Sequence, residues 1–257
     1  MVRGLYTAYT GMMQQQARME VLTNNLANST TVGFKKEGST SRAFDQVLAI
    51  KVRDSSTSYV DQVIGKMSLG VKVGETYTDY SQGSFKATEG PLDVALSGDG
   101  FFNISYRKKG SDEDQVMYTR SGEFALTQDG TLVTKDGDYV LGQNGMIVIP
   151  PKSTVTIDSD GAIYADDQYI DTFLVTDFEN RDYLAKYGEN LYRAVEGATV
   201  IEANPRFVQG YLEMSNVNIV SEMVDLIDVT RAYESNQKLI QAMDETLEKS
   251  VALGVLQ

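Results

Sequence analysis

The sequence predicts an α+β protein in which N- and C-terminal helices bracket a central antiparallel β domain. Apolar residues recur every seven positions at both ends of the chain, which is typical of helices that pair along one seam. Between these ends, Asp-Gly and Asn-Gly pairs separate short alternating apolar runs, which is the strongest local signal for β-hairpins. We therefore expect a helix in residues 1–35, a largely extended or irregular connection over 36–89, a β domain over 90–210 and a helix in 211–257.

The N-terminal helix is predicted from two rows of the seven-residue repeat. The first row is Leu5, Met12, Met19 and Leu26, and the second is Ala8, Gln15 and Leu22. A seam this narrow does not bury the helix by itself, so a partner is required. The helix should end within the run Asn24, Asn25, Leu26, Ala27 and Asn28, because asparagine tolerates the left-handed conformation found after a helix. Gly33 before Phe34 then predicts a turn.

The connecting segment and the β domain have local signals of their own. Residues 69–80 alternate like a strand, and the short apolar run 44–50 suggests a helical turn or two. Within the β domain, hairpin turns are expected at 99–100, 129–130, 136–137, 144–145 and 160–161, with further strands over 154–157, 162–165 and 171–176.

The C-terminal helix repeats the heptad pattern. Its rows are Ile219, Leu226, Tyr233, Ile240 and Leu247, followed by Met223, Thr230, Gln237, Asp244 and Val251. Asn216 or Asn218 is the expected N-cap. The polar residues of the second row either face solvent or fix the register of contacts to other chains. We expect an assembly interface formed by Leu5, Met12, Met19, Leu22, Leu26, Ile219, Met223, Leu226, Tyr233, Ile240 and Leu247.

The charge distribution indicates which helices pair. Residues 1–36 hold four basic side chains and one acidic side chain, whereas residues 213–257 hold eight acidic and three basic ones. This asymmetry favours pairing of the N-terminal helix with the C-terminal helix, although both charged faces would also be compatible with simple solvation. The net charge of −13 disfavours nucleic-acid binding. The chain also lacks an apolar run long enough to span a membrane.

Candidate catalytic and metal sites are weak. The sequence contains neither cysteine nor histidine, which removes thiolate metal sites, the usual general base and the commonest metal ligand. Asp158-Ser159-Asp160-Gly161 begins like a calcium loop but lacks the closing glutamate, so a turn is the better interpretation. We therefore expect no enzymatic activity, no metal and no cofactor. One alternative function is a monomeric cell-wall- or carbohydrate-binding β domain on a helical stalk.

Several motifs together resemble the family of bacterial flagellar rod and hook proteins. The N-terminal motif comprises Asn24, Asn25, Leu26, Ala27, Asn28, Gly33 and Phe34, and the C-terminal one covers residues 210–218 and 231–234. Residues 91–96, 98–102, 118–122 and 188–192 resemble the family's middle region. The resemblance covers essentially the whole chain, and leaves a proximal or a distal rod protein as alternatives.

The resemblance implies a structural subunit of the flagellar basal body. Such subunits polymerise into a helical tube that transmits torque from motor to hook, with their terminal helices paired as a coiled coil along the inner tube. Copies of the same chain, other rod and hook subunits and the flagellar type III export apparatus are the implied partners. Phe44 and Leu48 resemble the short motif by which early flagellar substrates are recognised for export, although an ordinary apolar turn explains them equally well.

Overall fold

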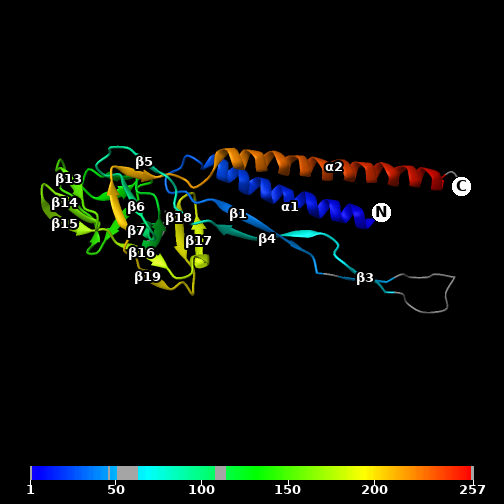
Figure 1. Cartoon of the computed structure of the whole chain (residues 1–257), viewed down its shortest axis with the longest axis horizontal. Helices are drawn as coiled ribbons and strands as arrows, with labels where there is room; N and C mark the ends of the chain where they lie inside the picture. Colours follow the sequence, from blue (N-terminus) through cyan, green and yellow to red (C-terminus); the bar gives the residue numbers. More distant parts are fainter. Residues whose placement is uncertain (1, 46, 51–62, 108–113, 256–257) are drawn as a thin grey trace. The chain divides into compact units, whose positions relative to one another are not determined.

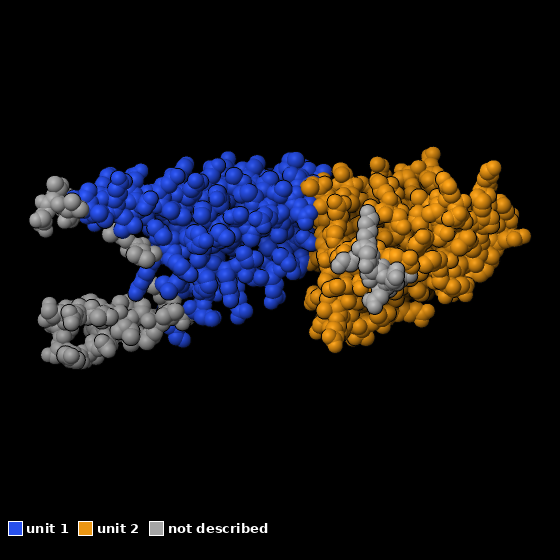
Figure 2. Space-filling view, turned by 180° about the vertical axis from the view of Figure 1, so that it is seen from behind, with its two compact units in different colours: residues 1–26, 37–77, 219–257 blue, residues 27–36, 78–218 orange. Residues whose placement is uncertain are grey.

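The computed structural model describes residues 2–45, 47–50, 63–107 and 114–255. It divides into two compact units (Figure 2), which are described one at a time. Unit 1 consists of residues 1–26, 37–77 and 219–257, and unit 2 of residues 27–36 and 78–218.

Unit 1 contains the two long helices of the chain. Helix α1 (Val2–Ala27) and helix α2 (Ile219–Val255) lie side by side (Figure 1). Helix α1 ends inside the asparagine-rich run, as predicted. Helix α2 begins directly after Asn218, one of the two expected N-caps. The structure therefore confirms a helix at each end of the chain.

The rest of unit 1 is a ribbon of short strands (Figure 1). Strands β1 (Glu37–Ala43) and β4 (Val71–Thr78) form one two-stranded sheet, and β2 (Val47–Ile50) pairs antiparallel with β3 (Val63–Met67). Strand β4 confirms the strand predicted in 69–80. The helical turn expected over 44–50 is wrong, because β2 occupies most of this run. Periodicity does not separate a short helix from a strand in four to seven apolar residues, and pairing with β3 decides the outcome.

Unit 2 is an assembly of short antiparallel strands. They are β5 (Phe85–Ala87), β6 (Val94–Ser97), β7 (Phe101–Arg107), β8 (Asp114–Thr119), β9 (Phe124–Leu126), β10 (Leu132–Thr134), β11 (Tyr139–Gly142), β12 (Gly145–Met146), β13 (Val155–Ile157), β14 (Ala162–Ala165), β15 (Gln168–Thr172), β16 (Val175–Phe178), β17 (Leu184–Tyr187), β18 (Leu191–Ala194), β19 (Val200–Glu202), β20 (Arg206–Gln209) and β21 (Tyr211–Glu213), with a 3₁₀ turn η1 (Arg181–Tyr183) before β17. The central antiparallel β region is thus confirmed, and the strand expected over 171–176 is divided between β15 and β16.

The largest sheet of unit 2 has the strand order β17-β18-β8-β7-β11-β10-β9. Strand β16 also pairs with β7 and β19, and β12 pairs with β11. Strands β13, β14 and β15 form a separate sheet, while β6 pairs with β20 and β5 with β21. The last two pairings are antiparallel and join residues more than 100 positions apart. They connect the first two strands of unit 2 with its last two strands.

Four of the five expected hairpin turns connect strands that pair with each other. These are the turns between β9 and β10, β10 and β11, β11 and β12, and β13 and β14. The turn at 99–100 is different, because β6 pairs with β20 while β7 pairs with β8, β11 and β16. The expected hairpin there is wrong: the turn sends the chain from one sheet to another.

An aromatic cluster fills the interior of unit 2. Phe102 is fully buried, and its ring lies 5.1 Å from that of Phe124 and 5.5 Å from that of Phe173, both edge to face. Phe173 stacks in turn on Phe207 at 5.7 Å. These rings belong to segments from β7 to β20, so one large apolar core joins strands of separate sheets. A second, smaller cluster consists of Phe101, Phe178, Leu184 and Tyr192.

Candidate assembly site

Helices α1 and α2 contact each other where α1 has glycine. A Cβ atom added at Gly4 would lie 2.6 Å from Met243 Cε, and one added at Gly11 would lie 3.2 Å from Asn236 Nδ2. A step of seven residues forward along α1 corresponds to seven residues backward along α2, so the helices are antiparallel. Because these two positions have no side chain, side chains of α2 can reach the α1 backbone.

The seam ends in a buried polar contact. Asn25 and Glu222 are both fully buried, and Asn25 Nδ2 donates a hydrogen bond to Glu222 Oε2 at 3.1 Å. The same amide also donates to the Glu37 carbonyl at 2.8 Å and accepts from the Glu37 N–H at 2.9 Å. Asn25 therefore joins α1, β1 and α2 through one side chain. Arg18 and Asp225 add an exposed ion pair at 3.8 Å, which contributes less than about 1 kcal/mol.

The row of α2 that faces α1 lies one residue before the expected second row. The contacting residues Glu222, Asn236 and Met243 share a seven-residue stripe with the buried Val229. Met223, expected on this seam, has 47% of its surface exposed, and Ile219 has 40%. The shift went undetected because the true row contains a glutamate and an asparagine, which an apolar pattern does not mark.

The other predicted interface residues are more buried than Met223 and Ile219. Leu22 is buried together with Ala8, the small residue of the same row. The remaining ones are half-buried: Leu5, Met12, Met19, Leu26, Leu226, Tyr233, Ile240 and Leu247. They flank the contact stripe on both helices, so each keeps part of its surface available.

The second half of the N-terminal motif belongs to unit 2. Gly33 has φ of +70°, its N–H donates to the Glu213 carbonyl at 2.8 Å, and an added Cβ would lie 2.4 Å from the Ser121 backbone nitrogen. Only glycine fits this conformation and this space. Phe34 is fully buried, with Lys186 Nζ 3.9 Å from its ring centroid.

Asn24, Ala27 and Asn28 complete the motif. Asn24 and Ala27 are exposed. Asn28 is buried, and its Oδ1 accepts a hydrogen bond from Thr31 Oγ1 at 3.2 Å. Residues of one short motif thus make contacts in both units. Asn25 contacts the helix pair of unit 1, whereas Gly33 and Phe34 are buried in unit 2.

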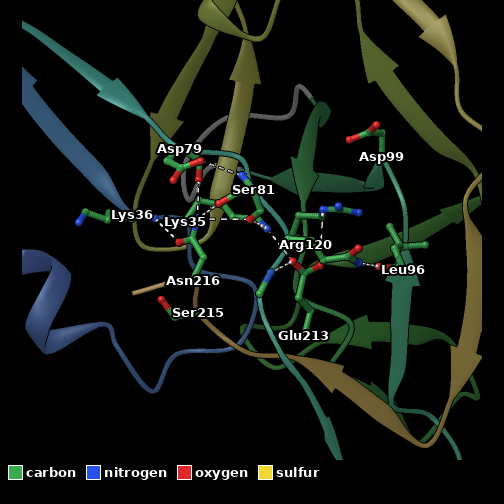
Figure 3. Close-up of polar contacts among 12 residues, drawn as sticks. Lys35, Lys36, Asp79, Ser81, Leu96, Asp99, Arg120, Glu213, Ser215 and Asn216 are labelled. Carbon is green, nitrogen blue, oxygen red and sulfur yellow. Dashed lines mark hydrogen bonds and ion pairs between the residues drawn. The ribbon is translucent and has the colours of Figure 1, made fainter. Parts of the chain in front are cut away.

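A buried ion cluster lies directly after this motif (Figure 3). Lys35 Nζ donates to Glu213 Oε1 at 2.5 Å and to the Ser81 carbonyl at 2.7 Å. Arg120 Nε lies 3.6 Å from Glu213 Oε2. At most 4% of each of the three charged side chains is exposed. Burial lowers the pKa of Lys35 and of Arg120, and the Glu213 carboxylate opposes this by favouring their charged forms.

Backbone groups complete the cluster and tie three distant segments together. The Gly83 N–H donates to Glu213 Oε1 at 3.0 Å. Asn216 Oδ1 accepts from the Lys36 N–H at 2.7 Å, and Asn216 Nδ2 donates to the Asp79 carbonyl at 2.8 Å (Figure 3). The segments 33–36, 79–83 and 213–216 are thereby held side by side. Sequence reasoning missed the roles of Glu213 and Arg120, although both lie in stretches that carry the family resemblance.

The candidate export residues lie just after β1 and within β2. Phe44 is half-buried and its N–H donates to the Gly70 carbonyl at 3.0 Å. Leu48 lies in β2, opposite Lys66 of β3, and its side chain is outside the described residues. Over the residues that the structure describes, no group of three acidic side chains is placed to hold a metal ion. Nor does any described helix have the length and apolar character needed to cross a membrane.

Three family models match separate parts of the chain. "Flagella basal body rod protein" matches residues 5–35, "Flagellar hook protein FlgE/F/G D1 domain" matches 95–165, and "Flagellar basal body rod FlgEFG protein C-terminal" matches 208–253. The first contains most of α1, the third contains most of α2, and the second covers about half of the β unit. The matches therefore follow the order of the structural elements.

Relatives that match almost the whole chain are also named as flagellar rod proteins. The chain is 35% identical to the flagellar basal-body rod protein FlgG of Buchnera aphidicola subsp. Schizaphis graminum, over 97% of this chain and 98% of the relative. Identity is also 35% to FlgG of Bacillus subtilis and 33% to FlgG of Caulobacter vibrioides, in each case over 98% of this chain and 99% of the relative. These relatives are named as rod proteins rather than enzymes, and a monomeric carbohydrate-binding function is not favoured. The chain belongs to the flagellar basal-body rod protein family and is a structural subunit of the bacterial flagellar basal body.

Proposed function

We propose that this chain polymerises into a helical tube that carries torque from the flagellar motor to the hook and encloses an export channel. The supporting observation is the helix pair of unit 1, which leaves Ile219, Met223 and other large apolar side chains exposed. No third long helix among the described residues covers them. Heterologous contacts between copies that do not close on themselves give an open helical filament.

The parts of the chain have different tasks in this proposal. Residues 1–35 and 211–257 form the inner tube, with α1 and α2 interlocked as an antiparallel coiled coil. Residues 36–89 connect this layer to an outer β domain over 90–210. Copies of the same chain and other rod and hook subunits are the partners.

The predicted interface residues divide into two groups. Leu5, Met12, Met19, Leu22, Leu26, Leu226, Tyr233, Ile240 and Leu247 stabilise the helix pair and present their remaining surface to neighbours. Ile219 and Met223 contact neighbours only. This division follows from their burial in a single copy.

Export through the flagellar type III apparatus completes the proposal, with Phe44 and Leu48 as the recognition pair. Phe44 directly follows β1 and Leu48 lies in β2, near the start of the protein, where an unfolded substrate would present them early. Comparing secretion of a Phe44→Ala chain with that of the parent chain tests this part. Unchanged secretion would remove Phe44 from the recognition pair.

Leu226→Asp tests the assembly proposal. Leu226 is half-buried beside the α1–α2 seam, so a carboxylate there is either desolvated or forces the helices apart. We expect loss of motility and of filaments in electron micrographs, with the near-ultraviolet circular dichroism of the aromatic core of unit 2 unchanged. Gln237→Asp, at an exposed position of the same helix, is the matched control and should swim like the parent. A motile Leu226→Asp strain would contradict the proposal.

A further inference from the structure

We propose that neighbouring copies meet through two apolar patches on unit 1, one on each helix. The α1 patch consists of Tyr6, Tyr9 and Met13, and the α2 patch consists of Val220, Val224 and Ile227. Each side chain has about half of its surface exposed or more, from 45% for Met13 to 73% for Val220. The inference rests on the proposed polymerisation and specifies which faces make the contact.

The α1 patch faces away from the other elements of unit 1. The opposite side of α1 contacts α2 through Gly4 and Gly11. A further side contacts the chain before β4, where Thr7 Oγ1 donates to the Leu69 carbonyl at 3.3 Å. Since both of these sides are occupied within one copy, the surface left on α1 for a neighbour is the one that carries Tyr6 and Tyr9.

The two patches have complementary spacing. Along α1 the apolar residues follow at intervals of three and four positions, and along α2 at intervals of four and three. In an antiparallel approach Tyr6 lies opposite Ile227, Tyr9 opposite Val224 and Met13 opposite Val220. Large aromatic side chains then face smaller branched ones, which is how knobs and holes alternate between packed helices.

The patches of one copy lie at different levels of the helix pair and do not meet each other. The register that places Gly11 beside Asn236 puts Tyr9 level with Lys238, and Val224 is fourteen positions away. At 1.5 Å per residue, a neighbour whose Tyr9 lies opposite Val224 is displaced by about 21 Å along the helix axis. Because two different patches form the contact and each copy is displaced along the axis, the contact repeats without closing and extends a filament.

Charge selects this pairing over a contact between two α2 helices. Helix α1 has two basic residues and one acidic residue, whereas α2 has seven acidic and three basic residues. Two α2 helices side by side would bring like charges together, while α1 against α2 brings opposite charges together. The partner of each patch is therefore the other patch on a second copy of this chain.

The absence of cysteine in the chain permits a direct test by disulfide crosslinking. Two full-length variants, Tyr9→Cys and Val224→Cys, are mixed, assembled and oxidised, so that a disulfide between positions 9 and 224 joins two copies. We expect a crosslinked dimer from the mixture and a ladder of multimers from the chain that carries both changes, because facing residues approach closely enough for a disulfide. Tyr9→Cys combined with Val251→Cys, an exposed α2 position outside the patch, is the control and should give no ladder.

Each outcome bears on the proposal. Filaments without a crosslink between positions 9 and 224 would overturn it, as would a dimer formed by Val224→Cys alone, which would show that α2 pairs with α2. A parent chain that forms no filaments would reject the proposed function itself, and the patch pairing with it. Electron cryomicroscopy of assembled rods gives a second readout, in which adjacent helix pairs should be staggered by about 21 Å.

Discussion

Each unit contains a buried polar cluster, at Asn25 in unit 1 and at Lys35 in unit 2, and these two clusters differ in kind. In unit 1 the amide of Asn25 connects Glu222 with the backbone of Glu37 at the end of the helix seam. In unit 2 the buried charges of Lys35, Glu213 and Arg120 are paired, and Arg120 lies 5.7 Å from the ring centroid of Phe101. The first cluster links three elements by hydrogen bonds, whereas the second holds three chain segments by paired charges.

The surroundings of the clusters explain this difference. Among the described residues of unit 1, the buried apolar side chains are Ala8, Leu22 and Val229, so the helix pair has a thin core. Unit 2 buries large aromatic and branched side chains across its sheets. A thin core supplies little stabilisation, because burial contributes only about 25 cal/mol per Å² of apolar surface. In the proposed assembly, contacts with other copies supply the stabilisation that this thin core lacks, whereas unit 2 buries a large apolar core within one copy.

Breaking the charged cluster should have the largest effect. Glu213→Gln leaves Lys35 and Arg120 buried without their counter-charge, and we expect the free energy of unfolding of unit 2 to fall by about 3–5 kcal/mol. Urea unfolding followed by tyrosine fluorescence measures the loss. Glu202→Gln, in the exposed strand β19, should change it by less than about 0.5 kcal/mol. Equal effects of the two variants would show that the buried cluster has no special role.

Breaking the amide cluster should have an intermediate effect confined to unit 1. Asn25→Leu removes three hydrogen bonds to buried or half-buried groups, and we expect α1 and β1 to open more easily by about 2 kcal/mol. Amide hydrogen exchange in these elements should then be about 30-fold faster, with the strands of unit 2 unaffected. Asn24→Leu, one position away and exposed, is the control. Faster exchange in the β7–β8 pair after Asn25→Leu would refute the independence of the two units.

The smallest effect is expected at an exposed ion pair of unit 2. Arg181 Nη2 lies 2.7 Å from Asp99 Oδ1, and this hydrogen bond lowers the pKa of Asp99 below its ordinary value of 3.8. A depressed carboxyl pKa stabilises the fold above the unfolded pKa, and this contribution is lost as the pH falls through the folded value. Arg181→Gln should therefore raise the pKa of Asp99 towards 3.8, measured by carboxyl NMR titration, and should weaken the dependence of stability on acid pH.

Loss of the Asp99 ion pair by itself should cost less than about 1 kcal/mol, because the Asp99 side chain is largely exposed and the pair is screened by solvent. Arg181→Gln also removes the two hydrogen bonds that Arg181 donates to Asp177, and their loss adds to the measured change. Arg206→Gln, an exposed arginine on β20, should leave the pKa of Asp99 unchanged. An ordinary pKa of Asp99 in the parent protein, or an unchanged pKa after Arg181→Gln, would show that Arg181 does not lower the pKa of Asp99.

Local signals predicted much of the fold but not the identity of the contacts. The end of α1 in the asparagine run and four hairpin turns follow from the conformations that asparagine and glycine adopt easily. The strand at 47–50 and the change of sheet at 99–100 could not be predicted from local signals, because both depend on which distant strand pairs with them. The ion cluster was also missed: Lys35 was only one of several basic residues near the N-terminus, and its burial requires Glu213, which is 178 positions away.

Local patterns in the sequence are enough to predict the two terminal helices, the antiparallel β region between them and the family to which the chain belongs. These features depend on periodicity, turn residues and motifs that are read within a few tens of residues. Tertiary structure decided the register of the helix seam, where Gly4, Gly11, Asn25 and Glu222 make the contacts and the expected row with Met223 is left exposed. The physical reason is that close approach of two helices selects small and hydrogen-bonding side chains at the contact, and an apolar pattern detects neither.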